Sequence, residues 1–297
     1  MRVISALVLS ALGLLASDAH AEACTYRVEK VNSGRLVANL YLPDTAHQAP
    51  VVIAVGGSEG GLGTGNANGE LLAPHCLAVL GLAYFKEAGL PATLDHIPLE
   101  YFIEAVDFLE TVPGIDASRI GFVGGSRGAE LALQFAAREP RIRSLVATTP
   151  SSVAWSGRTS AGSAWTLGAK DVPSLSLGPD NGAPQVERFK AALADQEKVR
   201  IAMPALERIN GPVLLVSATN DEVWPSYAMS QDMVAYLGLH HFAHSVLHRT
   251  FPTGHGFSQA TAPEIKQLII DHFVTSLAPP TSTAPGKTIP SLGNLTH

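Results

Sequence analysis

The sequence predicts an α/β fold built on a mostly parallel sheet with helices on both faces. Short runs rich in Val, Ile and Leu alternate along the chain with segments of helical periodicity, an order typical of parallel sheets. One of these runs leads into a glycine-flanked serine and then directly into a helical segment. The composition, 46% hydrophobic and 15% charged over 297 residues, indicates a globular chain with one large core.

The predicted elements begin with an antiparallel hairpin. Residues 26–31 and 36–42 are strand-like, and the turn signal Asn32-Ser33-Gly34 lies between them. Later segments are distinguished by whether their apolar residues run continuously, as in a buried strand, or recur at helical spacing. The continuous runs cover residues 51–55, 77–84, 119–123, 144–147, 212–217 and 242–248, and the helical segments cover residues 99–109, 129–137 and 263–277.

Residues 151–208 interrupt this alternation of strands and helices. They are rich in Gly, Ser and Pro and hold one helical patch near 186–199, so we expect a cap or long loop over the functional site. Residues 279–297 have little to bury and are expected to be disordered. The predicted catalytic domain is therefore 22–278, with the insert inside it.

The N-terminus has the pattern of an export signal. Arg2 is followed by an almost unbroken apolar run at 3–16, and the Ala-His-Ala triplet at 19–21 fits the small-x-small cleavage rule. We interpret residues 1–21 as a signal peptide, which predicts a secreted or periplasmic protein; an uncleaved anchor is the alternative. No later segment is long and apolar enough to span a bilayer, so we expect no stable membrane anchor after cleavage.

The two cysteines bear on a possible disulfide, and the net charge bears on the class of binding partner. In an oxidising compartment Cys24 and Cys76 could form a disulfide, and a buried free thiol at Cys76 is the alternative that the sequence leaves open. The net charge of −6 and the lack of a run of Lys or Arg argue against a nucleic-acid partner.

Residues Gly124-Gly125-Ser126-Arg127-Gly128 form a G-x-S-x-G motif between a predicted strand and a predicted helix. Such a turn is sharp, and glycines at both flanking positions relieve its crowding. The turn exposes the serine hydroxyl and sets the Arg127 N–H and the helix N-terminus beneath a reacting carbonyl. In this context the motif indicates the nucleophile elbow of an α/β-hydrolase, with Ser126 as the nucleophile.

A serine nucleophile needs a base and an acid that orients the base. In this fold they follow in the order Ser, Asp or Glu, His. Asp221 lies in a loop after a predicted buried strand and is the preferred acid, with Glu222 and Asp232 as rivals. His255 lies in a glycine-flanked loop after the last predicted strand and is the expected general base.

The loop 56–61 follows the predicted strand at 51–55. We expect it to supply one oxyanion-hole donor through the backbone N–H of Ser58, beside that of Arg127. Glu59 is next to this site, and its charge would oppose an oxyanion unless the side chain turns away or pairs with a cation. Arg127 is the candidate partner for Glu59.

The densest group of histidines raises the question of a metal site. His240, His241, His244 and His248 have neither a Cys nor a carboxylate set beside them. We therefore expect no metal, and triad chemistry needs no organic cofactor.

Six segments of the chain resemble one family. They are G-S-E-G-G at 57–61, L-A-Y-F at 82–85, L-P at 90–91, I-P-L-E-Y-F at 97–102, G-S-R-G-A-E-L at 125–131 and D-E-V-W-P-S at 221–226. They are similar to the C-terminal catalytic domain of the acyl-CoA thioester hydrolase / bile acid-CoA:amino acid N-acyltransferase (BAAT) family. The resemblance covers most of residues 26–277 and implies an α/β-hydrolase acting on acyl thioesters, with Ser126, Asp221 and His255 as its triad.

Two features separate this chain from parts of that family. Members that transfer acyl groups to amino acids use a cysteine nucleophile, whereas an acyl-serine ester reacts less readily with amines and so favours water. The predicted export signal removes the protein from cytosolic CoA esters, so a carboxylic ester is at least as well supported as a thioester.

We predict an exported serine hydrolase of a small acyl ester or thioester. Acyl transfer to an amine or alcohol, and a non-catalytic binding protein on a hydrolase scaffold, are the alternatives.

Overall fold

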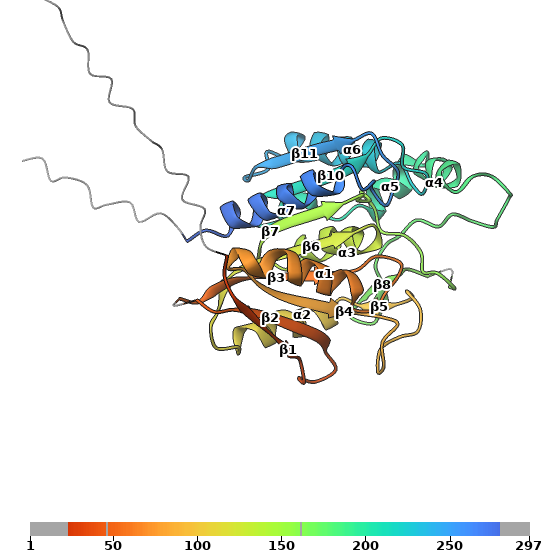
Figure 1. Cartoon of the computed structure of the whole chain (residues 1–297). Helices are drawn as coiled ribbons and strands as arrows, with labels where there is room; N and C mark the ends of the chain where they lie inside the picture. Colours follow the sequence, from red (N-terminus) through yellow and green to blue (C-terminus); the bar gives the residue numbers. More distant parts are fainter. Residues whose placement is uncertain (1–22, 46, 161, 280–297) are drawn as a thin grey trace, which may run out of the picture.

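An eight-stranded sheet runs through the molecule (Figure 1). The computed structural model describes residues 23–45, 47–160 and 162–279. The strands are β1 Tyr26–Lys30, β2 Val37–Pro43, β3 Ala49–Val55, β4 Ala78–Ala83, β6 Ile115–Gly125, β7 Ile142–Thr148, β10 Val213–Ala218 and β11 Val246–Phe251. They lie in the order β1-β2-β4-β3-β6-β7-β10-β11; β2 is antiparallel to both β1 and β4, and the other neighbours are parallel.

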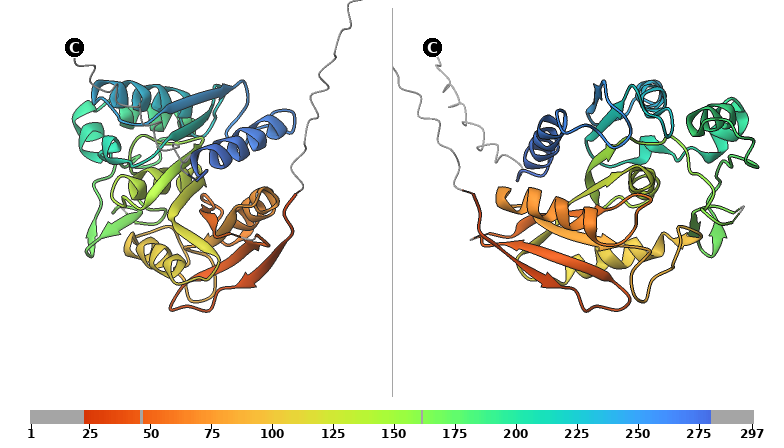
Figure 2. Two further views of the ribbon diagram at one scale, coloured as in Figure 1. Left: turned by 90° about the vertical axis from the view of Figure 1, so that its left-hand side faces the viewer. Right: turned by 45° about the vertical axis from the view of Figure 1, so that its right-hand side comes forward.

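Helices cover both faces of the sheet (Figure 2). The helices α1 Gly63–Leu72 and α7 Ala262–Ser276 bury Leu72 and Phe273 against one face, together with Val52. The helices α2 Glu100–Glu110, α3 Arg127–Ala136 and α6 Ser226–Leu239 bury residues such as Phe102 and Leu237 on the other. The predicted α/β class with a mostly parallel sheet is therefore confirmed.

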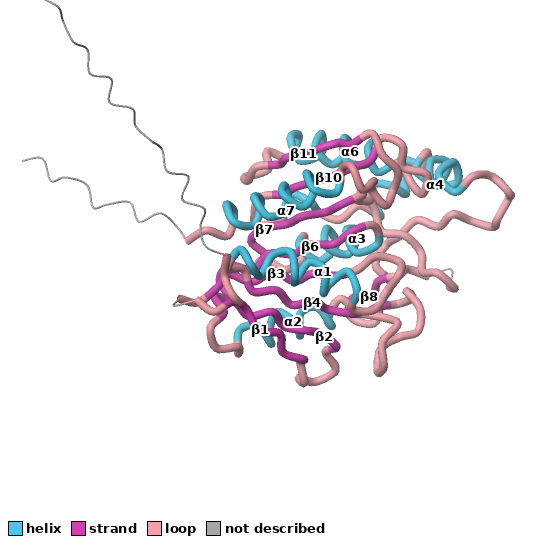
Figure 3. Tube along the Cα trace, in the orientation of Figure 1, coloured by secondary structure: helices cyan, strands magenta, loops and turns pink. Residues whose placement is uncertain are grey.

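Between β7 and β10 the chain leaves the sheet, and loops dominate this stretch (Figure 3). The strands β8 Trp165–Leu167 and β9 Lys170–Asp171 join β5 Ile97–Pro98 in a second, three-stranded sheet. The helices α4 Gln185–Leu193 and α5 Gln196–Ala202 and the 3-10 turn η2 Leu206–Arg208 follow. A separate buried cluster of seven residues holds this region together: Val153, Trp155, Leu175, Phe189, Ala202, Trp224 and Met229. The segment 151–208, expected as a cap or loop, lies in this excursion.

Some elements differ from the sequence-based expectation. The last strand occupies Val246–Phe251 rather than 242–248, because α6 continues to Leu239 and the parallel pairing with β10 sets the strand's register. Neither α1 nor α6 was expected, since α1 is rich in glycine and α6 also carries apolar residues on its exposed side. The single helical patch near 186–199 is two helices, because the side chain of Asp195 accepts the Lys198 N–H and begins α5.

A disulfide joins Cys24 to Cys76, with the two Cα atoms 5.3 Å apart. It closes a sequence separation of 52 residues, for which the chain-entropy model gives a stabilisation of roughly 4 kcal/mol. The two segments expected to be a signal peptide, 1–21, and a disordered tail, 279–297, lie outside the described residues except for Pro279. Within residues 23–279 as described, no helix combines the length and apolar character that crossing a bilayer requires.

Candidate active site

Ser126 is at the turn between β6 and α3. Its backbone has φ 55° and ψ −121°, an unusual conformation for a residue with a side chain. A side chain at Gly124 would collide with the backbone of Gly128, and one at Gly128 would collide with the carbonyl of Gly56, so both flanking positions of the motif must be glycine. The sharp turn predicted from the G-x-S-x-G pattern is therefore present, and it sets Ser126 at the end of the sheet.

Three side chains from separate loops form a line of hydrogen bonds. The Oγ atom of Ser126 lies 2.8 Å from Nε2 of His255. Nδ1 of His255 lies 2.9 Å and 3.0 Å from the two carboxylate oxygens of Asp221. Asp221 follows β10 and His255 follows β11, and both strands run parallel to β6, so all three loops meet at one edge of the sheet.

The two rival carboxylates have other positions. Glu222 accepts the backbone N–H of His255 at 3.0 Å, so it holds the loop that carries the imidazole. Asp232 lies within α6. Asp221 was the preferred acid and Glu222 its nearest rival; both follow the same strand, and they differ in where their side chains point.

Asp221 is held by more than the imidazole. Its Oδ1 accepts the N–H groups of Val223 and Trp224, and its Oδ2 accepts the hydroxyl of Ser226 at 2.6 Å. The indole of Trp224 packs edge-on against His255 with ring centroids 5.5 Å apart. Sequence reasoning assigned no role to Ser226 or Trp224, although both lie in the segment 221–226 that carries the family resemblance.

The loop after β3 lies against Ser126. A Cβ at Gly57 would be only 3.2 Å from the Cβ of Ser126, and the hydroxyl of Tyr84 donates to the Gly56 carbonyl at 2.9 Å to hold the loop. Ser58 therefore lines the same pocket as Ser126 and Arg127.

The carboxylate of Glu59 does not pair with Arg127. It accepts the Gly57 N–H at 2.8 Å and the Thr64 hydroxyl at 2.7 Å. The proposed Glu59–Arg127 pair is thus wrong, because the carboxylate folds back onto its own loop and α1. The charge beside the expected oxyanion site is satisfied locally.

Arg127 instead faces Glu130, one turn along α3, with Nη1 and Oε2 2.9 Å apart. Glu130 is completely buried, and its Oε1 accepts the Trp155 N–H at 2.9 Å and the Trp165 indole N–H at 2.6 Å. Burial raises the pKa of Glu130, and the Arg127 charge and the two hydrogen bonds oppose that shift in part. Arg127 also donates to the carbonyl of Ser156 at 3.1 Å. The pair thereby connects the turn at Ser126 to the segment that follows β7.

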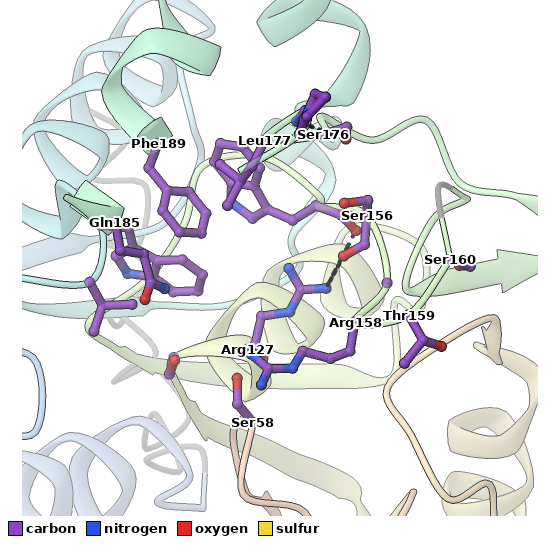
Figure 4. Close-up of a pocket in the computed structure, with 17 residues that line it drawn as sticks. Ser58, Arg127, Ser156, Arg158, Thr159, Ser160, Ser176, Leu177, Gln185 and Phe189 are labelled. Atoms are coloured by element: carbon purple, nitrogen blue, oxygen red, sulfur yellow. Dashed lines mark hydrogen bonds between the residues drawn. The ribbon is translucent and has the colours of Figure 1, made fainter. Parts of the chain in front are cut away.

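A pocket of about 540 Å³ opens beside Ser126 (Figure 4). Its volume is in the range of cavities that hold small-molecule ligands. One wall is aromatic: the Trp155 and Phe189 rings are 4.5 Å apart and the Phe189 and Trp224 rings 5.5 Å apart, both edge to face. The rest of the lining is mainly polar or small: Ser58, Arg127, Ser156, Gly157, Arg158, Thr159, Ser160, Ser176, Gly178 and Gln185.

The clustered histidines have local partners. His240 stacks on Tyr236 with centroids 4.1 Å apart, and Nε2 of His248 lies 2.7 Å from the Ser217 hydroxyl. Among the residues described, no group of three or more His, Cys, Asp or Glu side chains is arranged to hold a metal ion.

Residues 97–271 match the family described as BAAT / acyl-CoA thioester hydrolase C terminal, which is more than half of the chain. The chain belongs to this family. The resemblance drawn from the six sequence segments is confirmed: three of them lie within the matched residues, and the three at 57–61, 82–85 and 90–91 precede them.

Curated BAAT and thioesterase relatives show the same relationship. Mitochondrial acyl-coenzyme A thioesterase 2 of Mus musculus is 30% identical over 219 residues, which are 71% of this chain and 45% of that protein. Acyl-coenzyme A amino acid N-acyltransferase 2 of Mus musculus is 30% identical over 220 residues, covering 71% and 50%. Acyl-coenzyme A thioesterase 6 of Mus musculus is 44% identical over 107 residues, covering 36% and 25%. The chain spans a quarter to a half of the length of these relatives.

Solved structures resemble this family member in fold. Acetyl xylan esterase 1 from Thermoanaerobacterium sp. superposes with a TM-score of 0.54 at 17% identity, covering 86% of this chain and 90% of that one. Dienelactone hydrolase from Anabaena variabilis gives a TM-score of 0.51 at 18% identity, covering 86% and 100%. At such low identity the likeness shows the α/β-hydrolase fold alone.

Proposed function

We propose that this chain is an exported serine hydrolase that cleaves a carboxylic ester or thioester through an acyl-serine intermediate. The observation that carries the proposal is the line of hydrogen bonds from Ser126 Oγ through His255 to Asp221. This arrangement of a nucleophile, a base and an orienting acid is the one that serine hydrolases use on unrelated folds.

In the proposed reaction, His255 Nε2 takes the proton from Ser126 as Oγ attacks the acyl carbon. Asp221 keeps the imidazole in the tautomer with a proton on Nδ1 and stabilises the cation that forms. The backbone N–H groups of Ser58 and Arg127 stabilise the tetrahedral oxyanion, each by roughly 3–4 kcal/mol. His255 then protonates the departing alcohol or thiol, and a water activated by His255 releases the acid and restores Ser126.

Two observations support export. Paired cysteines persist in oxidising compartments and are rare in the cytosol, and Cys24 and Cys76 form a disulfide. The segment 1–21 has the signal-peptide pattern. We therefore place the protein in the periplasm or outside the cell, and the ester or thioester that it meets there is its proposed substrate.

The proposal is tested by hydrolysis of p-nitrophenyl esters from acetate to palmitate, beside matching acyl-CoA substrates. We expect turnover that Ser126→Ala removes almost completely and that Ser33→Ala, in the remote hairpin turn, retains. A serine-directed phosphonate should label the wild-type protein and leave Ser126→Ala unlabelled. Unchanged hydrolysis in Ser126→Ala would refute the mechanism, and a folded wild-type protein that neither turns over nor labels would favour a binding protein.

Acyl transfer is the second candidate function, because two of the relatives are named acyl-coenzyme A amino acid N-acyltransferases. It would use the same three residues and differ only in the acceptor that attacks the acyl-enzyme. Adding glycine or another amine to the reaction distinguishes the two: an N-acyl product supports transfer, and free acid alone supports hydrolysis.

A further inference from the structure

The charges that line the pocket beside Ser126 are all of one sign. Arg127 and Arg158 are the two charged residues in its lining, which includes no Asp or Glu from the described part of the chain. The whole chain carries a net charge of −6. A positive pocket on an acidic protein is a local feature of the site, and it attracts anions into this cavity.

The two arginines are not equivalent. Arg127 is buried, is paired with Glu130 and donates to the Ser156 carbonyl, so its charge is already compensated. Arg158 is exposed, and its guanidinium has no ion pair or hydrogen bond to any residue that the structure describes. A guanidinium offers five N–H donors in a planar fork, and those of Arg158 are free to bind a ligand.

The backbone that carries Arg158 is fixed. Asp95 accepts the N–H groups of Thr159 and Ser160, each at 3.0 Å, and the hydroxyl of Thr159 at 2.8 Å. Partial burial raises the pKa of Asp95, but hydrogen bonds from the Thr93 side chain and from Thr159 and Ser160 outweigh it and hold the pKa well below its ordinary value. The Arg158 N–H itself donates to the Leu94 carbonyl at 3.1 Å. The side chain therefore extends from a loop with a defined position at the edge of the pocket.

Three carboxylates near the pocket bind other groups in the described structure. Asp95 is engaged with the loop N–H groups, and Glu59 is folded onto Gly57 and Thr64. Asp180, just beyond the pocket lining, lies 3.4 Å from Arg188. Each of these carboxylates has its own partners, and none of them forms an ion pair or a hydrogen bond with the guanidinium of Arg158.

We propose that Arg158 binds an anionic group of the substrate, a carboxylate or a group of similar charge, while the aromatic wall of Trp155, Phe189 and Trp224 packs against its apolar part. The substrate class would be esters or thioesters that carry a negative charge in the same small molecule, close enough to the reacting carbonyl for both to occupy one cavity of about 540 Å³. This inference rests on the hydrolase function proposed above. It adds a residue that determines specificity.

Two matched pairs of chromogenic esters test the proposal. In the first pair the charge is on the acyl side: 4-nitrophenyl hydrogen adipate against 4-nitrophenyl methyl adipate. In the second it is on the leaving group: 3-butanoyloxy-4-nitrobenzoate against its methyl ester. Within each pair a remote carboxylate is replaced by its methyl ester, and comparison with the Arg158 variants separates the effect of the charge from that of the added methyl group and of leaving-group acidity. We expect wild-type kcat/KM to favour the anionic member of at least one pair roughly ten- to hundredfold, the effect of one charge-assisted hydrogen-bonded contact, and the pair that responds shows which side carries the anion.

Variants at Arg158 identify the origin of that preference. Arg158→Gln should abolish it, mainly by raising KM for the anionic ester, and leave kcat/KM for the neutral ester within about threefold. Arg158→Lys should keep part of it, since Lys provides the charge without the planar fork. Arg249→Gln, which removes an exposed arginine on β11 outside the pocket, is the matched control and should retain the preference.

Binding to Ser126→Ala separates the two proposals. Monomethyl adipate should bind this variant more tightly than dimethyl adipate in calorimetry, and Ser126→Ala/Arg158→Gln should bind both equally. Equal turnover of both members of each pair by an active wild-type enzyme, or an anion preference that survives Arg158→Gln, would overturn the anion site and leave the hydrolase function intact. Lack of turnover with anion binding that depends on Arg158 would overturn the hydrolase function and support the anion site.

Discussion

Asp221 and Glu130 are both buried carboxylates close to Ser126, and their oxygens bind different parts of the molecule. The Asp221 side chain is 2% exposed, and three of its donors belong to its own loop or to the start of α6: the Val223 and Trp224 N–H groups and the Ser226 hydroxyl. Its remaining partner is the imidazole of His255.

Glu130 is not exposed at all, and its partners come from farther away. Its hydrogen-bond donors are the Trp155 N–H and the Trp165 indole, both in the excursion between β7 and β10, and its counter-charge is Arg127. Two carboxylates of similar burial thus make different connections: Asp221 contacts His255, the proposed base, whereas Glu130 connects α3 to the region that lines the pocket. We expect substitutions at Asp221 to change rate and those at Glu130 to change stability.

Asp221→Asn should show the largest effect. The amide keeps the shape of the carboxylate and still accepts hydrogen bonds from its loop, but it no longer favours the productive tautomer of His255. We expect kcat for ester hydrolysis to fall by roughly 10⁴-fold, with little change in the free energy of unfolding. Glu222→Gln is the matched control, because the neighbouring amide can still accept the His255 N–H; its kcat should fall less than about tenfold. Similar losses in both variants would refute the assignment of Asp221 as the orienting acid.

Glu130→Gln should have the second largest effect, on stability. It leaves the Arg127 guanidinium buried without its counter-charge, and we expect the free energy of unfolding to fall by about 3–5 kcal/mol in denaturant titrations. Arg127→Met/Glu130→Gln removes both charges and preserves the backbone N–H at 127. It should recover much of the stability, and a double variant no more stable than Glu130→Gln would show that the ion pair is not the cause.

Two histidines can be compared in the same way, and their comparison predicts how the stability of the protein depends on pH. His255 has a partner on each ring nitrogen, whereas His272 of α7 is largely buried, and this burial lowers its pKa from the ordinary 6.5 to about 4. The unfolded chain therefore binds a proton below pH 6.5 that the folded protein resists until about pH 4. Stability should be complete above pH 6.5 and decrease by about 3 kcal/mol as the pH falls through this window.

Chemical unfolding between pH 7 and 4 measures this decrease. His272→Gln should flatten the pH dependence, since the variant has no group to titrate at that position, and His47→Gln, at an exposed histidine, should leave it unchanged. An unaltered slope in His272→Gln would contradict the assignment of the effect to this side chain.

The local sequence was enough to predict the class of fold and the types of residue at the candidate site. Continuous apolar runs predicted the buried strands, and the hairpin and the glycine-flanked Ser126 are defined by neighbouring residues. The positions proposed for the acid and the base could be chosen because the ends of parallel strands meet at one edge, so loops far apart in sequence converge. Helix α6 was missed because its apolar residues show no clear helical periodicity. Its boundaries depend on packing and not on a local pattern.

The partners of individual side chains were decided by the tertiary structure alone. Asp221 and Glu222 are adjacent in sequence, yet one carboxylate contacts the imidazole and the other a backbone N–H. Arg127 pairs with Glu130 rather than Glu59. The sequence determined which residues could act, because strand pattern and turn geometry are local properties. Which way each charged side chain points depends on groups brought close by long-range packing, and no local pattern contains that information.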